Sequence, residues 1–356
     1  MGELLEQVLL ANIYLQPVQF TVTIVANSLN ICILCSRALR SSPCTYYFLA
    51  YAWFNIIYAS LICPIQFLRG FQIDLANGQL GCKLHYYILF TIPHQANFML
   101  VLASFDRYFS SSKSRQLHMR SSLRIARISV LIGWLMPALY MSPMLIIYYY
   151  DPISNKCLPR SNIFILIYTA GQLIIFYVLT PLIMFIMGFL TIQNVRRPST
   201  GRVSMVSSWR TRRREGELTR MLILQFTVHL ILILPFGIIY GLNFFVPSTR
   251  TPMIKAIRFV SVIWQQCDYF VSLFLYILSG NIYRQELIRI LKFNQRGPTH
   301  FRTCVLYRRD PDRKLPLLTT ALPPTDAVPI LRSLTITSTI NFRHRLFFES
   351  LKITDI

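Results

Sequence analysis

No charged residue interrupts the stretch Ile163-Phe-Ile-Leu-Ile-Tyr-Thr-Ala-Gly-Gln-Leu-Ile-Ile-Phe-Tyr-Val-Leu-Thr-Pro-Leu-Ile-Met-Phe-Ile-Met-Gly-Phe-Leu-Thr-Ile192. An α-helix rises about 1.5 Å per residue, so about 20 apolar residues cross a hydrocarbon core about 30 Å thick. The stretch is longer than this minimum. It therefore predicts a membrane-spanning helix over residues 162–192, and the class of fold depends on how many such stretches accompany it.

Six further apolar stretches of similar character flank this one along the chain. The seven predicted spans cover residues 16–36, 45–68, 83–108, 125–147, 162–192, 218–246 and 256–279. The composition agrees, because 54% of the residues are hydrophobic and only 14% are charged, against about 25% charged in a soluble domain. The sequence therefore predicts an all-α membrane protein, a bundle of seven transmembrane helices.

The formal net charge of +22 invites a nucleic-acid partner, but the positions of the basic residues argue against one. If the N-terminus is outside the cell, the cytoplasmic loops at 37–40, 113–127 and 196–214 hold 14 Lys and Arg residues, and the opposite loops hold seven. This asymmetry is the positive-inside pattern of membrane proteins. We therefore expect an extracellular N-terminus, a cytoplasmic C-terminus and no nucleic-acid partner.

The regions flanking the spans predict the domain organisation. Residues 1–15 are expected to form a short extracellular N-terminus. The segment Asn281-Ile-Tyr-Arg-Gln-Glu-Leu-Ile-Arg-Ile-Leu-Lys292 separates apolar from basic residues at helical spacing, which predicts an amphipathic helix on the inner leaflet. The membrane domain then covers 16–293, and the Pro-rich and Ser/Thr-rich residues 294–356 are expected to form a mostly disordered cytoplasmic tail.

The motif Ala103-Ser-Phe-Asp-Arg-Tyr108 ends the third span just before a basic loop. A charged pair at the end of a membrane helix is unfavourable unless it is partnered, so its position is informative. The motif resembles the signature of the rhodopsin-like G-protein-coupled receptors. The resemblance implies that Asp106, Arg107 and Tyr108 belong to a switch that couples the receptor to a heterotrimeric G protein.

Two cysteines, Cys82 and Cys157, fall in predicted extracellular positions, where a disulfide can persist. Cys82 precedes Arg107 by 107 − 82 = 25 residues, roughly 37 Å along a helix, so the two lie at opposite membrane faces. The receptor family has a bridge at this place. The resemblance and the compartment therefore both predict a Cys82–Cys157 disulfide between the second extracellular loop and the third span.

Further positions match the family pattern in order and spacing from about residue 16 to 293. They are Asn27, Leu49-Ala50, Trp134, Pro181, Pro235 and Tyr276. The resemblance implies that Asn27, Trp134, Pro181 and Pro235 belong to the core of the bundle, and that Tyr276 belongs to the activation switch. Asp268 is also assigned to the core, because it is predicted to lie deep in the membrane.

Glu215 lies at the foot of the sixth span, 20 residues before Pro235. Many relatives carry an acid there that pairs with the arginine of the third helix. We expect Arg107 to pair with Asp106 and Glu215 at rest, so that an agonist releases the sixth helix outward. The alternative is that Glu215 only offsets the charge of the neighbouring arginines. Separately, the basic loop 193–217 is expected to contact anionic lipid, the G protein or both.

Several family positions are altered. Relatives place an aspartate three residues after the position of Ala50, and this chain has Trp53 there. Ile233 and Ser272 stand where relatives have a tryptophan and an asparagine. Asp268 is the only carboxylate predicted deep in the membrane. It is expected to be protonated or to hydrogen-bond to Asn27 or Asn55, in preference to a metal or proton-relay role. A signalling-poor or decoy receptor is the alternative that these changes leave open.

Leu89 occupies the third-helix position where amine receptors have an aspartate, which argues against an amine ligand. Polar and aromatic residues in the outer halves of the helices suit a short peptide with little charge selectivity, and ordinary helix packing is the competing explanation. The candidate ligand contacts are Leu89, His94, Gln172, Tyr240, Asn243, Trp264 and Gln265, with Tyr148, Tyr149, Tyr150 and Lys156 from the second loop. His94 and His229 lack a third ligand, so no metal site or cofactor is expected.

An enzyme and a transporter are the rival classes. An intramembrane protease needs paired catalytic groups at membrane depth, and a transporter is expected to show internal repeats or interrupted helix pairs. Neither pattern is present in the sequence. We therefore expect a plasma-membrane receptor, not an enzyme, whose partners are an extracellular peptide, a G protein, membrane lipid and, through a phosphorylated tail, arrestin; an unmodified tail is the alternative.

Overall fold

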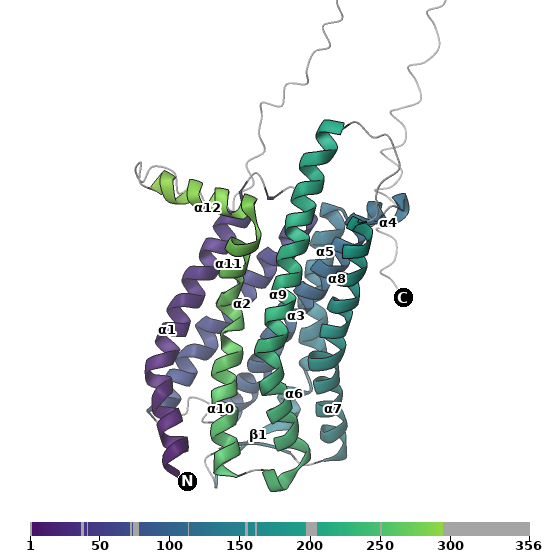
Figure 1. Ribbon diagram of the computed structural model, residues 1–356. Coiled ribbons are helices and arrows are strands. Elements are labelled where there is room, and N and C mark those ends of the chain that lie inside the picture. The colour runs from purple at the N-terminus through teal and green to yellow at the C-terminus, as the bar shows by residue number, and fades with distance from the viewer. Residues whose placement is uncertain are drawn as a thin grey trace, which may run out of the picture. The chain divides into compact units, whose positions relative to one another are not determined.

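The computed structural model describes residues 2–294, apart from 37–38, 41, 72, 74–77, 113, 154–155, 161, 197–204 and 250. Among these residues, seven helical segments are long and apolar enough to cross a membrane. Figure 1 shows them running side by side as one bundle. The predicted seven-helix membrane fold is therefore confirmed.

The elements follow one another along the described chain. They are α1 (Gly2–Leu34), α2 (Pro43–Gly70), α3 (Gln79–Ser111), α4 (Arg115–Arg120), α5 (Leu123–Met141), α6 (Met144–Ile147), β1 (Tyr148–Asp151), β2 (Lys156–Pro159), α7 (Ile163–Leu173), the π-helix η1 (Ile174–Leu179), α8 (Thr180–Arg196), α9 (Met205–Phe245), the 3-10 helix η2 (Pro247–Thr249), α10 (Pro252–Gln266), α11 (Asp268–Ser279) and α12 (Asn281–Asn294).

The first helix begins much earlier than the sequence predicts, at Gly2 instead of near residue 16. The prediction placed the polar residues that precede the apolar run outside the membrane, and therefore began the helix after them. In the structure Asn12 and Gln16 are buried, and the Gln16 side-chain amide donates to Gln266 Oε1 at 3.0 Å. These polar groups therefore face α10 and do not end the helix.

The sixth span also begins earlier than predicted. Its helix, α9, starts at Met205, inside the segment 193–217 that was expected to form a loop. Its first turns contain Arg, Glu and Met, which favour helix. The seventh span is divided, since α10 ends at Gln266 and α11 begins at Asp268. The predicted amphipathic segment is α12, which Figure 1 shows turning across the end of the bundle.

The fifth span contains a π-helical turn, η1, immediately before α8. Pro181 has no N–H, so the regular ladder of hydrogen bonds is interrupted at this point. The Thr180 hydroxyl donates to the carbonyl of Ile175 at 2.8 Å, five residues back. The wide turn carries the rings of Phe176 and Tyr177, which pack edge to face and line the cavity described below.

A short hairpin, β1 with β2, covers one end of the bundle. Its strands pair antiparallel with Tyr150 opposite Cys157. The predicted disulfide is present, because Cys157 is bonded to Cys82 of α3 with 5.6 Å between the Cα atoms. The Tyr148 ring stacks on Tyr86 with centroids 3.7 Å apart. We call this the hairpin end of the bundle, and the opposite end the α12 end.

Candidate functional site

A cavity of about 400 Å³ lies among α2, α3, η1, α9 and α10 beneath the hairpin. Seven of the predicted ligand contacts line it. They are Leu89, His94, Tyr148, Gln172, Tyr240, Asn243 and Gln265. We call this space the outer cavity. Its size and mixed lining resemble those of small-molecule sites.

Two buried polar groups form the inner part of the outer cavity. The His94 ring Nδ1 lies 2.7 Å from the carbonyl oxygen of Phe90. A carbonyl can only accept, so Nδ1 carries the proton and Nε2 presents a lone pair. His94 Nε2 and Gln172 Oε1 are both buried without a hydrogen-bond partner in the described part of the chain. Both atoms are therefore acceptors that a ligand can satisfy.

Aromatic side chains and an arginine form the outer part of this cavity. The Tyr148 and Tyr240 hydroxyls lie next to each other and interact. Burial raises the pKa of the Tyr148 hydroxyl well above its ordinary value, and the nearby Arg258 guanidinium opposes this shift. The Arg258 charge therefore lies close to the inner wall of the hairpin, within the lining of the cavity.

Two sequence expectations about this region need correction. Trp264 does not line the cavity, because it is 48% exposed and its indole N–H donates outward to Ile231 O. Of the three consecutive loop tyrosines, Tyr148 alone is in the lining. Trp53 is 48% exposed whereas Asn55 is fully buried, so α2 directs Asn55, and not Trp53, into the bundle.

At the α12 end, Arg107 is almost completely buried on α3. Its guanidinium forms an ion pair with Asp106 at 2.8 Å and donates to the hydroxyl of Ser42 at 3.1 Å. Asp106 in turn accepts from the Ser121 hydroxyl at 2.7 Å. The expected Asp106–Arg107 pair is thus present, and the sequence analysis missed the two serines that connect it to α2 and to the loop before α5. Tyr108 is half-buried against Phe109.

The acid expected to complete this ion pair lies outside the described side chains, since Glu215 belongs to the first turns of α9 whose side chains are not described. A second acid of α9 is described. The Glu217 carboxylate accepts from the main-chain N–H of Ile282 at 3.0 Å. This contact joins the foot of α9 to the first turn of α12.

Tyr276 lies on α11 close to the same end, with 1% of its surface exposed. Its ring packs between Phe48 and Tyr283, with centroids 5.4 Å and 5.5 Å away, and its hydroxyl is buried without a partner among the described residues. Tyr283 donates to the Asn30 side chain, and burial raises the pKa of the Tyr283 hydroxyl. Tyr276 therefore joins α2, α11 and α12 through its ring.

A buried polar network occupies the middle of the bundle. The Asp268 carboxylate lies 2.8 Å from His229 Nδ1 and accepts from the Tyr51 hydroxyl at 3.3 Å. The Gln225 amide donates to the same Tyr51 oxygen at 3.3 Å. Asp268 also begins α11, where the helix dipole favours negative charge. We call these four residues the central network.

The expected partners of Asp268 are replaced by others. Asn27 and Asn55 both donate to the main-chain carbonyl of Tyr269, at 2.7 Å and 3.3 Å. The side chain of Asp268 binds His229 and Tyr51 instead. Asn27 is therefore a core residue that ties α1 to α11, as its burial at 0% exposure also shows.

Two of the remaining core predictions are wrong, because Trp134 and Pro235 are exposed, whereas Pro181 is buried. Trp134 is half exposed on the outer face of α5, and its main-chain carbonyl accepts from the Gln95 amide at 2.7 Å. Pro181 follows the π-helical turn, and Pro235 lies inside α9. Among the described residues, no group of three or more His, Cys, Asp or Glu side chains is arranged to hold a metal ion.

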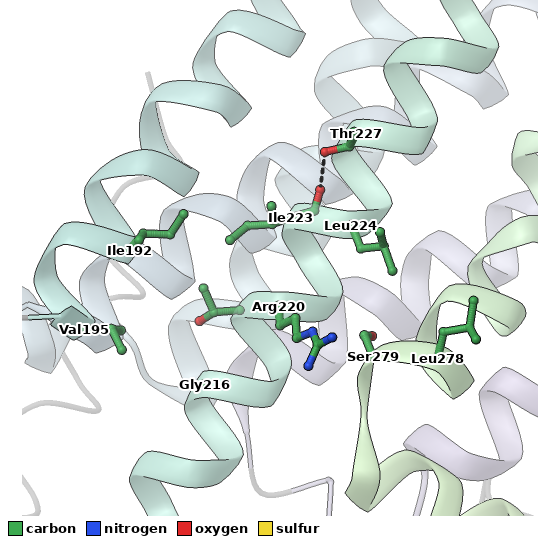
Figure 2. A pocket seen from close by; sticks show the side chains of 10 residues that line it. Ile192, Val195, Gly216, Arg220, Ile223, Leu224, Thr227, Leu278 and Ser279 are labelled. Atoms are coloured by element: carbon green, nitrogen blue, oxygen red, sulfur yellow. Dashed lines mark hydrogen bonds between the residues drawn. The ribbon is translucent and has the colours of Figure 1, made fainter.

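A second cavity of about 420 Å³ lies near the α12 end, between α8, α9 and α11. Figure 2 shows its lining, with Ile192 and Val195 of α8 facing α9 and with Leu278 and Ser279 contributed by α11. Arg220 of α9 is the charged side chain in this lining. The foot of α9 is thus incompletely packed against both of its neighbours.

Comparison with known proteins gives two findings. A family model described as 7 transmembrane receptor (rhodopsin family) matches residues 26–274. The gonadotropin-releasing hormone receptor of Sus scrofa is 24% identical over 94 residues, which is 26% of this chain and 28% of that receptor. The second match therefore spans little more than a quarter of its relative.

The family match covers well over half of the 356 residues, and the seven helices and the disulfide fit it. Members of this family are multi-pass proteins of the plasma membrane and are receptors, not enzymes. The chain therefore belongs to the rhodopsin family of seven-transmembrane receptors.

Proposed function

We propose that this receptor binds an extracellular ligand, a short peptide, in the outer cavity and activates a heterotrimeric G protein at the α12 end. One observation carries the proposal: α3 lines the outer cavity with Leu89 and His94 and, further along, holds the buried Asp106–Arg107 pair. One continuous helix, α3, thus contributes residues to the proposed ligand site and to the proposed G-protein site. The hairpin end is then extracellular and the α12 end cytoplasmic, as the positive-inside pattern predicts.

The contacts of α9 suggest how the ends communicate. Near the hairpin it contributes Tyr240 and Asn243 to the outer cavity. In the middle it contributes His229 and Gln225 to the central network. At its foot it borders the second cavity, where space beside Ile223 and Arg220 leaves the helix loosely packed. A ligand that binds Tyr240 or Asn243 would stabilise a displaced position of α9. It would thereby shift the equilibrium of the receptor from a resting to an active state.

In the resting state, Arg107 is held by Asp106 and Ser42, and we propose that Glu215 completes this restraint. Displacement of α9 then removes Glu215 and opens the cytoplasmic face to the G protein. The basic residues of the loop before α9 are proposed to contact the G protein and anionic lipid. Arrestin is proposed to bind the phosphorylated tail, including Ser333, Thr335, Thr337, Ser338 and Thr339, which lies outside the described residues.

A peptide ligand is supported by the lining of the outer cavity and by one relative. The cavity combines aromatic rings with amide and imidazole groups, a mixture that suits backbone and side-chain groups of a peptide. The similar receptor from Sus scrofa is named for gonadotropin-releasing hormone. Leu89 contributes an apolar surface where an amine would require a carboxylate.

A peptide-library screen in cells expressing the receptor tests this function, with G-protein dissociation as the readout. At least one short peptide is expected to raise G-protein activation over cells without the receptor. The Arg107→Ala variant, matched for surface abundance with an N-terminal tag, should bind the same peptide and lose activation. A peptide that binds but activates through neither form would indicate a decoy receptor, and absence of any binding peptide would contradict the ligand class.

A further inference from the structure

Two basic side chains line the outer cavity. Among the described residues that line it, the only Lys, Arg, Asp or Glu side chains are Arg69 and Arg258. They come from different helices, since Arg69 lies in the last turn of α2 and Arg258 lies in α10. A concave site with apolar walls and charges of one sign concentrates its electric field and attracts ligands of the opposite charge. The lining therefore favours an anionic ligand.

The side chain of Arg258 is placed by its neighbours to meet such a ligand. Its guanidinium lies 6.0 Å from the ring centroid of Phe259, itself a lining residue, and its charge acts on the hydroxyls of Tyr148 and Tyr240. A guanidinium offers several N–H donors in one plane, and a carboxylate accepts two of them side by side. Two tyrosine hydroxyls beside it add further hydrogen-bonding groups.

The charged and neutral polar groups lie at different depths. Arg258 is 258 − 252 = 6 residues beyond the start of α10, about 9 Å along the helix. His94 is 94 − 79 = 15 residues beyond the start of α3, about 22 Å along it. The inner groups, His94 Nε2 and Gln172 Oε1, are acceptors without a partner among the described residues. A matching ligand is therefore anionic at its outer end and has a neutral donor at its inner end.

A simpler explanation is that arginines at helix ends only reach toward the membrane surface. Lys255 provides the comparison, because it lies three residues before Arg258 on α10, is exposed and is not part of the cavity lining. Reaching toward the surface requires no cavity, whereas Arg69 and Arg258 converge on one. Lys255 is thus a matched control on the same helix.

We propose that the ligand of the outer cavity presents a carboxylate to Arg69 and Arg258, while its apolar body contacts the aromatic walls and a hydroxyl or amide N–H reaches Gln172 and His94. The carboxylate belongs either to the free C-terminus of a short peptide or to a free carboxylic acid. This inference rests on the proposed function only in assigning the ligand to this cavity, and it does not depend on G-protein coupling.

Binding to the purified full-length receptor in detergent tests the proposal. One arm uses N-acetylated tripeptides of aromatic and aliphatic residues, each made as the free acid and as the C-terminal amide. The other arm uses octanoic and dodecanoic acid beside octanamide and dodecanamide. The acid is expected to bind at least about tenfold more tightly than its amide in one arm, which identifies the source of the carboxylate.

Four variants test which side chains cause the preference for the acid over the amide. Arg69→Gln and Arg258→Gln should each weaken acid binding by about tenfold and leave amide binding unchanged. Arg258→Lys should retain part of the preference, and Lys255→Gln should retain all of it. Thermal unfolding without ligand checks that each variant is folded.

Three results would overturn the inference. They are equal binding of acids and amides to the wild type, failure of every acid in both arms to bind, and an acid preference that survives in both Arg69→Gln and Arg258→Gln. An acid that binds with the expected preference but does not activate a G protein would keep this inference and contradict only the coupling step.

Discussion

At the scale of single residues, the Asp268–His229 contact is a buried pair whose loss has a large expected cost. Both side chains are buried, with 2% and 1% of their surfaces exposed, and they lie 2.8 Å apart. Removing one member of a buried pair leaves the other without its partner in a medium of low polarity, which is strongly destabilising. The pair therefore stabilises the contact of α9 with α11.

The His229→Ala variant is expected to lower the free energy of unfolding by about 3 kcal/mol because Asp268 loses this partner. The double variant His229→Ala with Asp268→Ala should be less destabilised than the sum of the two single variants. Thermal unfolding of the three purified receptors measures this difference. Additive losses would show that the two side chains do not interact.

The sequence could identify Asp268 as a deep carboxylate but not its partner. Asp268 and His229 are 39 residues apart, and their contact depends on how α9 and α11 are rotated about their axes. In the same way, the rotation of α2 and α10 about their own axes decides that Trp53 and Trp264 face outward while Asn55 and Gln265 face inward. Spacing from a motif gives the order of residues along a helix, and small errors of register move a side chain to another face.

At the scale of secondary-structure elements, the close approach of η1 to α9 shapes the outer cavity. A Cβ atom added to Gly237 would lie 2.4 Å from Cδ1 of the Tyr177 ring. The absence of a side chain at Gly237 thus allows the ring to pack directly against the backbone of α9. Tyr177 also lines the outer cavity, so this contact connects helix packing with the ligand site.

The Gly237→Ala variant is expected to force the Tyr177 ring aside and to lower stability by about 1–3 kcal/mol, the usual effect of overpacking. Binding of any outer-cavity ligand should weaken as well. Gly241→Ala is the matched control one turn along α9, because its added Cβ would lie 3.7 Å from Leu173 Cδ1. Equal thermal unfolding of both variants would contradict this account of the packing.

Element boundaries were less predictable than element existence. All seven spans were evident from hydropathy, and α12 was evident from its separated apolar and basic residues. The N-terminal extension of α1 was missed because Asn12 and Gln16 are polar, yet both are buried in the bundle. Polar residues that hydrogen-bond to a neighbouring helix cannot be told from loop residues by composition.

At the scale of the whole molecule, three layers of contacts run along the bundle. The outer cavity lies beneath the hairpin, the central network joins α2, α9 and α11, and Arg107 is held by Asp106 and Ser42 near the α12 end. The contacts at the two ends of the bundle were predictable from motifs and from the disulfide. The central network was not, because it is built from contacts between distant parts of the chain.

The Asp106–Arg107 contact is proposed to restrain a G-protein-coupling switch. The most direct test measures basal G-protein activation in cells expressing wild type, Asp106→Asn, Arg107→Ala and the double variant at matched surface abundance. Loss of the Asp106 charge weakens the hold on Arg107, so Asp106→Asn should raise basal activation several-fold, and both forms that lack Arg107 should show none. Unchanged activation in Asp106→Asn, or an increase that persists without Arg107, would contradict the account.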